Sequence, residues 1–87
     1  ENKIVGYIIG TIEKNKYEKF GYIEEIFISK DFRKMGISTE LKNSFIKFLK
    51  SKKIKLCRLE VSPKNEAKNV YEKWGFKIEK YRMGVKI

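Results

Sequence analysis

The sequence predicts a single α+β domain with a mixed, largely antiparallel central sheet, helices packed against it and the element order β-β-α-β-α-β. Three segments, 4–12, 20–29 and 54–61, have the continuous or alternating apolar pattern of strands, whereas a segment beginning at Ile37 has helical spacing. The middle β-α-β unit is α/β-like. With 87 residues, 41% hydrophobic and 14% aromatic, the chain is globular and has room for one small core.

The first two strands are expected to form a hairpin. Residues 4–12, IVGYIIGTI, are rich in β-branched side chains that favour strands, and the polar residues 13–19 are typical of a connection. In residues 20–29, strict alternation would place Tyr22, Glu24, Ile26 and Ile28 on one face of the sheet, and Ile23, Glu25 and Phe27 on the other.

A helix is expected from Ile37, because one apolar stripe recurs at helical spacing and lysines gather toward its C-terminal end. This stripe, predicted to lie in the core, consists of Ile37, Leu41, Phe45, Phe48 and Leu49. Residues 54–61 return to strand alternation, which Ser62-Pro63 ends. Since a β-α-β connection joins neighbouring parallel strands, the strands before and after the helix should lie parallel or splayed.

The last third of the chain predicts a short helix and a final strand. Residues 64–74 place Ala67, Val70, Tyr71 and Trp74 on one helical side. Gly75 suits the position after a helix C-terminus, where left-handed backbone is common. Residues 76–87 are expected to form a last strand or hairpin.

The rare residue types exclude several kinds of chemistry. The chain has no histidine, which excludes Ser-His-Asp and Cys-His catalysis and argues against zinc, so we expect no metal. Its single cysteine, Cys57, excludes a disulfide within the chain and suits a reducing cytoplasm. Cys57 lies in a strand-like run and is expected to be a plain core thiol.

The net charge of +10 is spread over nearly every segment. Only Arg33, Arg58 and Arg82 are arginines, the residue that nucleic-acid readers favour, so a nucleic-acid partner is not expected. The positive field should attract anions and argues mildly against a polycationic substrate. No apolar run approaches the ~20 residues that span a bilayer, and no signal peptide is recognised.

Residues 32–38, FRKMGIS, stand where a strand ends and a helix begins. The unpaired amides of a helix start form an anion site, Gly36 permits close approach of a phosphate, and Arg33 and Lys34 add positive charge. The loop has neither the Walker A nor the G-x-G-x-x-G spacing. Taken alone, this loop is equally well explained as a simple turn.

A second segment, LEVSPKNEAKNVYEKWGF at residues 59–76, joins a strand, a break, Asn65 and a helix that carries Tyr71. Together with the loop Arg33-Lys34-Met35-Gly36-Ile37-Ser38, it resembles the GNAT-type N-acetyltransferases over about residues 4–80. Ser38 stands where that family usually has Gly or Ala, which adds a small side chain near the phosphates.

The resemblance implies acetyl-coenzyme A as co-substrate and a primary amine as acceptor. The loop amides of residues 33–38 would hold the pyrophosphate, and Tyr71 would be the general acid that protonates the departing thiolate. The exposed backbone at Ile26 to Ile28 would pair with the pantetheine arm as an added strand does. The cofactor-binding residues implied are therefore Ile26, Phe27, Ile28, Arg33, Lys34, Met35, Gly36, Ile37, Ser38 and Asn65.

The general base is expected to be Glu24, acting directly or through water, because strict alternation puts it on the face of Ile26 and Ile28. Glu25 is the runner-up. Each assignment has a structural alternative: Tyr71 as a core aromatic, Glu24 as a solvated carboxylate and Asn65 as a helix N-cap.

Members of the resembled family usually carry a strand, two helices and another strand before the segment that begins here at Ile4. Residues 1–87 are therefore expected to be one partial domain, with the cofactor half present and much of the acceptor wall missing. An unpaired edge on strand 4–12 would favour a homodimer. The alternative function is a non-catalytic fragment that binds coenzyme A or nucleic acid.

Overall fold

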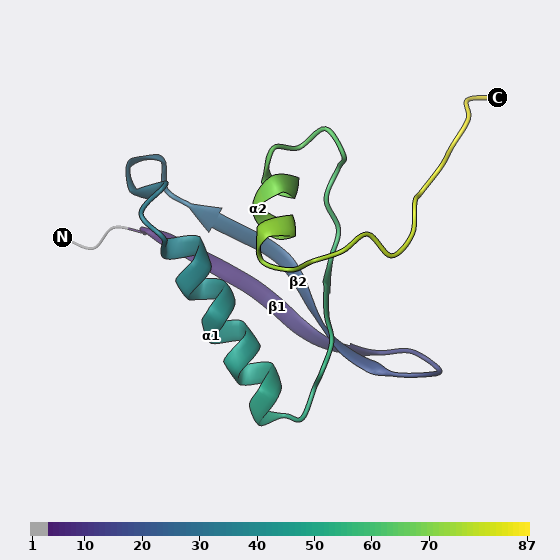
Figure 1. Ribbon diagram of the computed structural model, residues 1–87, viewed down its shortest axis with the longest axis horizontal. Coiled ribbons are helices and arrows are strands. Elements are labelled where there is room, and N and C mark those ends of the chain that lie inside the picture. The colour runs from purple at the N-terminus through teal and green to yellow at the C-terminus, as the bar shows by residue number, and fades with distance from the viewer. Residues whose placement is uncertain (1–3) are drawn as a thin grey trace.

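The computed structural model describes residues 4–87 and forms a three-stranded sheet with two helices (Figure 1). Strand order is β1-β2-β3. The elements are β1 Gly6–Lys14, β2 Lys19–Ile28, a 3-10 turn Lys30–Phe32, α1 Ile37–Ser51, β3 Cys57–Leu59 and α2 Ala67–Lys73. This confirms the α+β class, the start of α1 and the order of the first five elements.

The hairpin of β1 and β2 is antiparallel and runs nearly the length of the molecule (Figure 1). Its turn is closed by Asn15, whose side-chain Oδ1 accepts hydrogen bonds from the amides of Tyr17 and Glu18 at 2.8 and 2.9 Å. Asn favours such turns because its side chain reaches the backbone two residues on. The predicted hairpin is confirmed, with β1 shifted two residues toward the turn.

A β-bulge interrupts the hairpin at Glu24. Ile9 pairs with Glu25 while Gly10 pairs with Ile23, so β2 carries one extra residue. The bulge changes the phase of the alternation: Ile23 is buried in the core, and Ile26 packs against the same core cluster. The expectation that Ile23 and Ile26 lie on opposite faces was therefore wrong, because strict alternation assumes an uninterrupted ladder.

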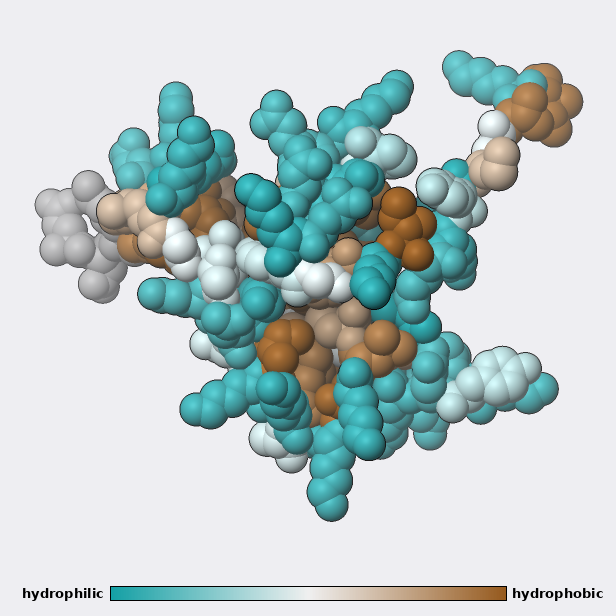
Figure 2. Space-filling model, viewed as in Figure 1, coloured by the Kyte–Doolittle hydropathy of each residue, from teal (hydrophilic) through white to brown (hydrophobic). Residues whose placement is uncertain are grey.

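Helix α1 packs on the sheet through Phe45 and Leu49, which form the core with Ile23 and Ile54. The helix lies close to the sheet because the strand residues that face Phe45 and Leu49 are glycines. A Cβ atom placed on Gly10 would lie 2.5 Å from Cζ of Phe45, and one on Gly21 would overlap Leu49. Figure 2 shows apolar residues still visible between the hydrophilic side chains on the helix-bearing side.

Strand β3 pairs in parallel with β2, as the β-α-β connection predicts. The ladder has only three rungs, from Gly21 opposite Cys57 to Ile23 opposite Leu59. β2 continues for five more residues to Ile28 without β3 beside it, so the two strands are splayed.

Helix α2 ends in a Schellman motif. Gly75 has φ +96°, its amide donates to the carbonyl of Glu72, and the amide of Phe76 donates to the carbonyl of Tyr71, both at 3.0 Å. The expected position of Gly75 is confirmed. Phe76 also contacts the Tyr71 ring, with centroids 6.4 Å apart, so this helix end fixes the orientation of Tyr71.

The predicted last strand is not formed: residues 76–87 carry no strand within the described structure. The apolar pattern is present, but a strand requires a neighbouring row of amides and carbonyls, and this segment leaves the sheet (Figure 1). It is tied to β3 by a side-chain pair, Arg58 Nε to Glu79 Oε1 at 2.7 Å. Beyond it, Tyr81 and Met83 are 75% and 90% exposed.

Candidate functional site

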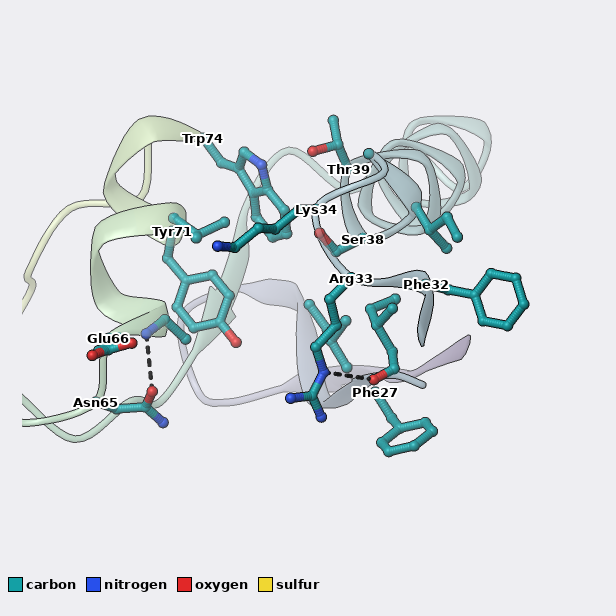
Figure 3. Close-up of a pocket in the computed structure, with 16 residues that line it drawn as sticks. Phe27, Phe32, Arg33, Lys34, Ser38, Thr39, Asn65, Glu66, Tyr71 and Trp74 are labelled. Atoms are coloured by element: carbon teal, nitrogen blue, oxygen red, sulfur yellow. Dashed lines mark hydrogen bonds between the residues drawn. The ribbon is translucent and has the colours of Figure 1, made fainter. Parts of the chain in front are cut away.

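A groove of about 670 Å³ opens between the end of β2, the loop into α1, and α2 (Figure 3). It exists because β2 and β3 separate after Ile23 and Leu59. Its lining is Ile26, Phe27, Ile28, Phe32, Arg33, Lys34, Gly36, Ile37, Ser38, Thr39, Asn65, Glu66, Ala67, Val70, Tyr71 and Trp74. The fold thus brings together two segments that the sequence marked separately.

The far part of β2 forms one wall. Ile26, Phe27 and Ile28 line the groove, in the part of β2 that has no neighbour on its β3 side. Backbone groups along such a strand can receive an extended ligand as an added strand. The bulge at Glu24 lies immediately beyond the last rung shared with β3, so it marks the point of divergence.

The loop into α1 has the geometry of an anion cradle. Lys34 and Gly36 have φ +64° and +80°, and no side chain caps α1, which leaves the amides of its first turn available. No protein atom lies within 4 Å of a Cβ built on Gly36, so a ligand can approach the backbone there. These features fit a pyrophosphate, as the loop sequence predicts.

Arg33 anchors this loop. Its Nε donates a 3.1 Å hydrogen bond to the carbonyl of Ile28, which ties the loop to the end of β2 (Figure 3). Lys34 and Ser38 also line the groove, whereas the side chain of Met35 is 65% exposed and does not. Any contact from Met35 would therefore come from its backbone.

Asn65 stands at the start of α2 and lines the groove. Its Oδ1 accepts a 2.9 Å hydrogen bond from the amide of Ala67, the first residue of α2, whereas the N-cap position itself is Glu66. This hydrogen bond uses the side-chain oxygen and leaves the amide nitrogen of Asn65 able to donate, so it is compatible with a contact to a ligand.

Tyr71 projects its hydroxyl from α2 into the groove, toward Arg33 (Figure 3). Trp74 and Phe76 pack around its ring, with centroids 5.5 and 6.4 Å away. Burial raises the pKa of Tyr71 above its ordinary value. The hydroxyl is therefore protonated at neutral pH, the state in which it can donate a proton.

Glu24 lies outside the groove. It is exposed at the bulge, and it does not share a face with Ile26 and Ile28, which was the reason for preferring it. Glu25 is also exposed and accepts a 2.8 Å hydrogen bond from the hydroxyl of Tyr7. Of the two expected catalytic residues, the structure brings Tyr71 to the groove and leaves Glu24 outside it.

Several lining residues were not predicted as site residues. Val70 and Trp74 were assigned to the apolar side of a helix. The signal was present, because Val70 and Trp74 share the helical face of Tyr71. Trp74 also lies under Lys42 of α1, whose Nζ is 5.2 Å from the ring centroid, so it joins the two helices.

The acetyltransferase (GNAT) family model matches residues 1–76, and the chain belongs to this family. No curated protein was found to match it.

Solved structures agree with this assignment. A protein from Pyrococcus furiosus described as an acetyl transferase is 29% identical, with a TM-score of 0.83, and the match covers 98% of this chain and 58% of that one. A Trypanosoma brucei acetyltransferase is 24% identical, with a TM-score of 0.79, covering 98% and 61%. A chain of the NatC complex, solved with Gag peptide and CoA, is 26% identical with a TM-score of 0.81, covering 87% and 49%. This chain thus spans about three fifths of the first two structures.

Two further properties concern the described residues. Within residues 4–87, no helix is long and apolar enough to cross a membrane. In the same range, no three His, Cys, Asp or Glu side chains form a group that could hold a metal ion.

Proposed function

We propose that this chain transfers an acetyl group from acetyl-coenzyme A to a primary amine by direct attack of the amine. The loop amides of residues 33–38 would hold the pyrophosphate, with Arg33 and Lys34 supplying positive charge. The backbone of Ile26 to Ile28 would pair with the pantetheine arm. The bound co-substrate would supply an activated thioester, and the protein would supply the groups that move protons and stabilise the oxyanion.

Two side chains would move protons. Tyr71 would donate its hydroxyl proton to the departing sulfur, which its position in the groove supports. Glu24 would accept the proton of the amine; because it lies outside the groove, a water molecule would have to relay that proton. A backbone amide of β2 beyond the bulge would stabilise the developing oxyanion.

One observation carries the proposal. The loop before α1 and the Tyr71 hydroxyl come from separate segments, yet they face a single groove beside the part of β2 that has no neighbour on its β3 side (Figure 3). A phosphate site alone requires only the loop, and a core aromatic would have its hydroxyl buried among side chains. The arrangement of both around one groove beside β2 suits a long anionic thioester.

The test is calorimetry of the chain with acetyl-coenzyme A, followed by thiol release in the presence of primary amines. Tyr71→Phe should lower turnover by roughly 100-fold, because it removes the acid, and should leave cofactor affinity unchanged. Tyr81→Phe, at a residue that is 75% exposed, is the matched control and should behave as the unmodified chain.

A non-catalytic coenzyme A-binding fragment is the alternative, since the chain spans 58% of the length of the Pyrococcus furiosus structure. It predicts cofactor binding without thiol release for any amine. Absence of cofactor binding would reject both functions. Binding to nucleic acid that weakens steeply with salt would favour the other alternative.

A further inference from the structure

Lys42 of α1 and Trp74 of α2 form a contact between the two helices. The Nζ atom lies 5.2 Å from the centroid of the indole ring, within the range of about 6 Å in which a cation is attracted to the face of a tryptophan. Both residues are half-buried, which strengthens this attraction because less water screens the charge. The contact therefore ties together two segments that are far apart in the sequence.

This contact differs from the other two in which a lysine lies over an aromatic ring in the described part of the chain. Lys16 lies over Tyr17, its neighbour in sequence, and Lys52 lies over Phe48, four residues earlier. Pairs so close in sequence meet through local chain geometry and connect no separate elements. Lys42 also forms no salt bridge with another described residue, so no carboxylate there competes for its ammonium group.

Helix α2 needs such a contact because few others in the described structure hold it. It has only seven residues, none of them buried, and its ion pair of Lys68 with Glu72 lies within the helix itself. A helix this short depends on tertiary contacts for its stability. Phe76, directly after the helix, packs against the core and provides one of them. An attachment at one end leaves the helix free to rotate about its axis, which the contact with Lys42 prevents.

Trp74 connects this contact to Tyr71. The two residues are three positions apart on one helical face, and their ring centroids lie 5.5 Å apart with an interplanar angle of 48°. Both line the groove, and the Tyr71 hydroxyl points toward Arg33 (Figure 3). A rotation of α2 that separates Trp74 from Lys42 would therefore turn this hydroxyl away from its place in the groove.

We propose that Lys42 is a positioning residue for the transfer reaction: it holds Trp74, and thereby sets the orientation of α2 and of the Tyr71 hydroxyl. This inference rests on the proposed function, in which Tyr71 donates a proton to the departing sulfur. Lys42 itself does not line the groove, so it acts through its neighbours and not on the co-substrate. Misplacing a catalytic group by about 1 Å can lower a rate by about 100-fold, so a residue outside the groove can control turnover in this way.

The first measurement is the fluorescence of Trp74, which is the only tryptophan of the chain. Lys42→Gln removes the cation and loosens the ring, so acrylamide should quench Trp74 more strongly than in the unmodified chain. Lys42→Arg keeps a cation that also binds aromatic rings and should restore the original quenching. Lys47→Gln removes the same charge from an exposed position of α1, and this control should leave the quenching unchanged.

The second measurement is turnover, followed by thiol release from acetyl-coenzyme A in the presence of a primary amine. Lys42→Gln should lower kcat roughly tenfold and leave the KM for acetyl-coenzyme A unchanged, because the loop before α1 stays in place. Lys42→Arg should restore kcat, and Lys47→Gln should not alter it. In the Tyr71→Phe background, Lys42→Gln should have no further effect, because the hydroxyl that it positions is already absent.

Three outcomes would contradict the inference in different ways. Unchanged quenching in Lys42→Gln would overturn the contact and the positioning role together. An equal loss of turnover with and without the Tyr71 hydroxyl would show a general loss of folded chain, and would overturn the positioning role while leaving the proposed function intact. Thiol release by no chain, the unmodified one included, together with the expected quenching would reject the proposed function and hence the catalytic role of Lys42, while the contact between the helices would stand.

Discussion

Two residues in the loop before α1 adopt the left-handed region that side chains disfavour. Lys34 has φ +64° and Gly36 has φ +80°. A lysine in this region costs about 1 kcal/mol, so the surrounding structure stabilises a conformation that the local sequence does not prefer. The gain is that successive amides converge on one side of the loop, where the anion would lie.

Gly36→Ala separates the backbone requirement from packing. A Cβ at Gly36 would meet no protein atom within 4 Å, so the cost of about 1 kcal/mol comes from φ +80° alone. We expect a melting temperature lower by about 5 °C and weaker binding of acetyl-coenzyme A by calorimetry. Gly84→Ala is the control, because Gly84 is equally open and has no positive φ. Unchanged cofactor affinity in Gly36→Ala would contradict the cradle.

The stability of the folded chain depends on pH through Cys57, and the direction of this dependence follows from the pKa of its thiol. Burial raises the pKa of this half-buried thiol from 9.0 to about 11. The folded chain holds the proton more tightly, so this contribution to stability is complete below pH 9 and is lost as the pH rises through 11. At pH 8 a thiol reagent should label the native chain much more slowly than the urea-unfolded chain. Equal labelling rates at pH 8 would show an exposed, ordinary thiol instead.

At the scale of elements, the sequence predicted what short-range periodicity determines. The start of α1 at Ile37, the hairpin and Gly75 after α2 were all correct, because each is specified by neighbouring residues. The bulge at Glu24 was not, since nothing in the alternation of FGYIEEIFIS marks an extra residue. The prediction of a last strand was wrong for another reason. The apolar pattern of residues 76–87 can be read locally, but a strand also needs a neighbouring strand, which the local sequence does not specify.

The same distinction applies to the site. The loop 33–38, Asn65 and Tyr71 were predicted from motif and resemblance, and all of these residues except Met35 line one groove. The placement of Glu24 was wrong because it depended on the phase of β2, which the bulge alters.

The packing of α1 on the hairpin predicts a strong effect at Gly10. A Cβ there would lie 2.5 Å from the Phe45 ring, so Gly10→Ala must displace α1 or the ring, at a cost of about 1–3 kcal/mol. Urea unfolding should show this loss. Phe45→Leu makes room, so the double variant should lose less than the sum of the two single losses. If the stability losses of the two single variants add up in the double variant, the Phe45 ring does not limit the space at Gly10.

At the scale of the whole molecule, charge is distributed unequally between the two sides of one thin sheet. The helix-bearing side shows mostly hydrophilic side chains (Figure 2), while the residues of β1 and β2 that alternate with the core-facing Ile8, Ile23 and Ile26 include no lysine. The sheet itself has three strands, and β1 lies at its edge. The groove beside β2 and the edge of β1 thus lie on different strands of the sheet.

The free edge of β1 leads to the last prediction, that the chain forms a homodimer through this edge. An edge strand offers unpaired amides and carbonyls, and Ile9 of β1 is 44% exposed beside them. Sedimentation velocity should show a dimer that dissociates on dilution. Ile9→Lys places a charge at the edge, a common means of blocking strand addition, and should raise the dissociation constant roughly tenfold. Met83→Lys, at a residue 90% exposed outside the sheet, is the control and should leave association unchanged. A monomer at millimolar concentration would show that the edge does not pair with a second copy. A dimer insensitive to Ile9→Lys would place the contact elsewhere.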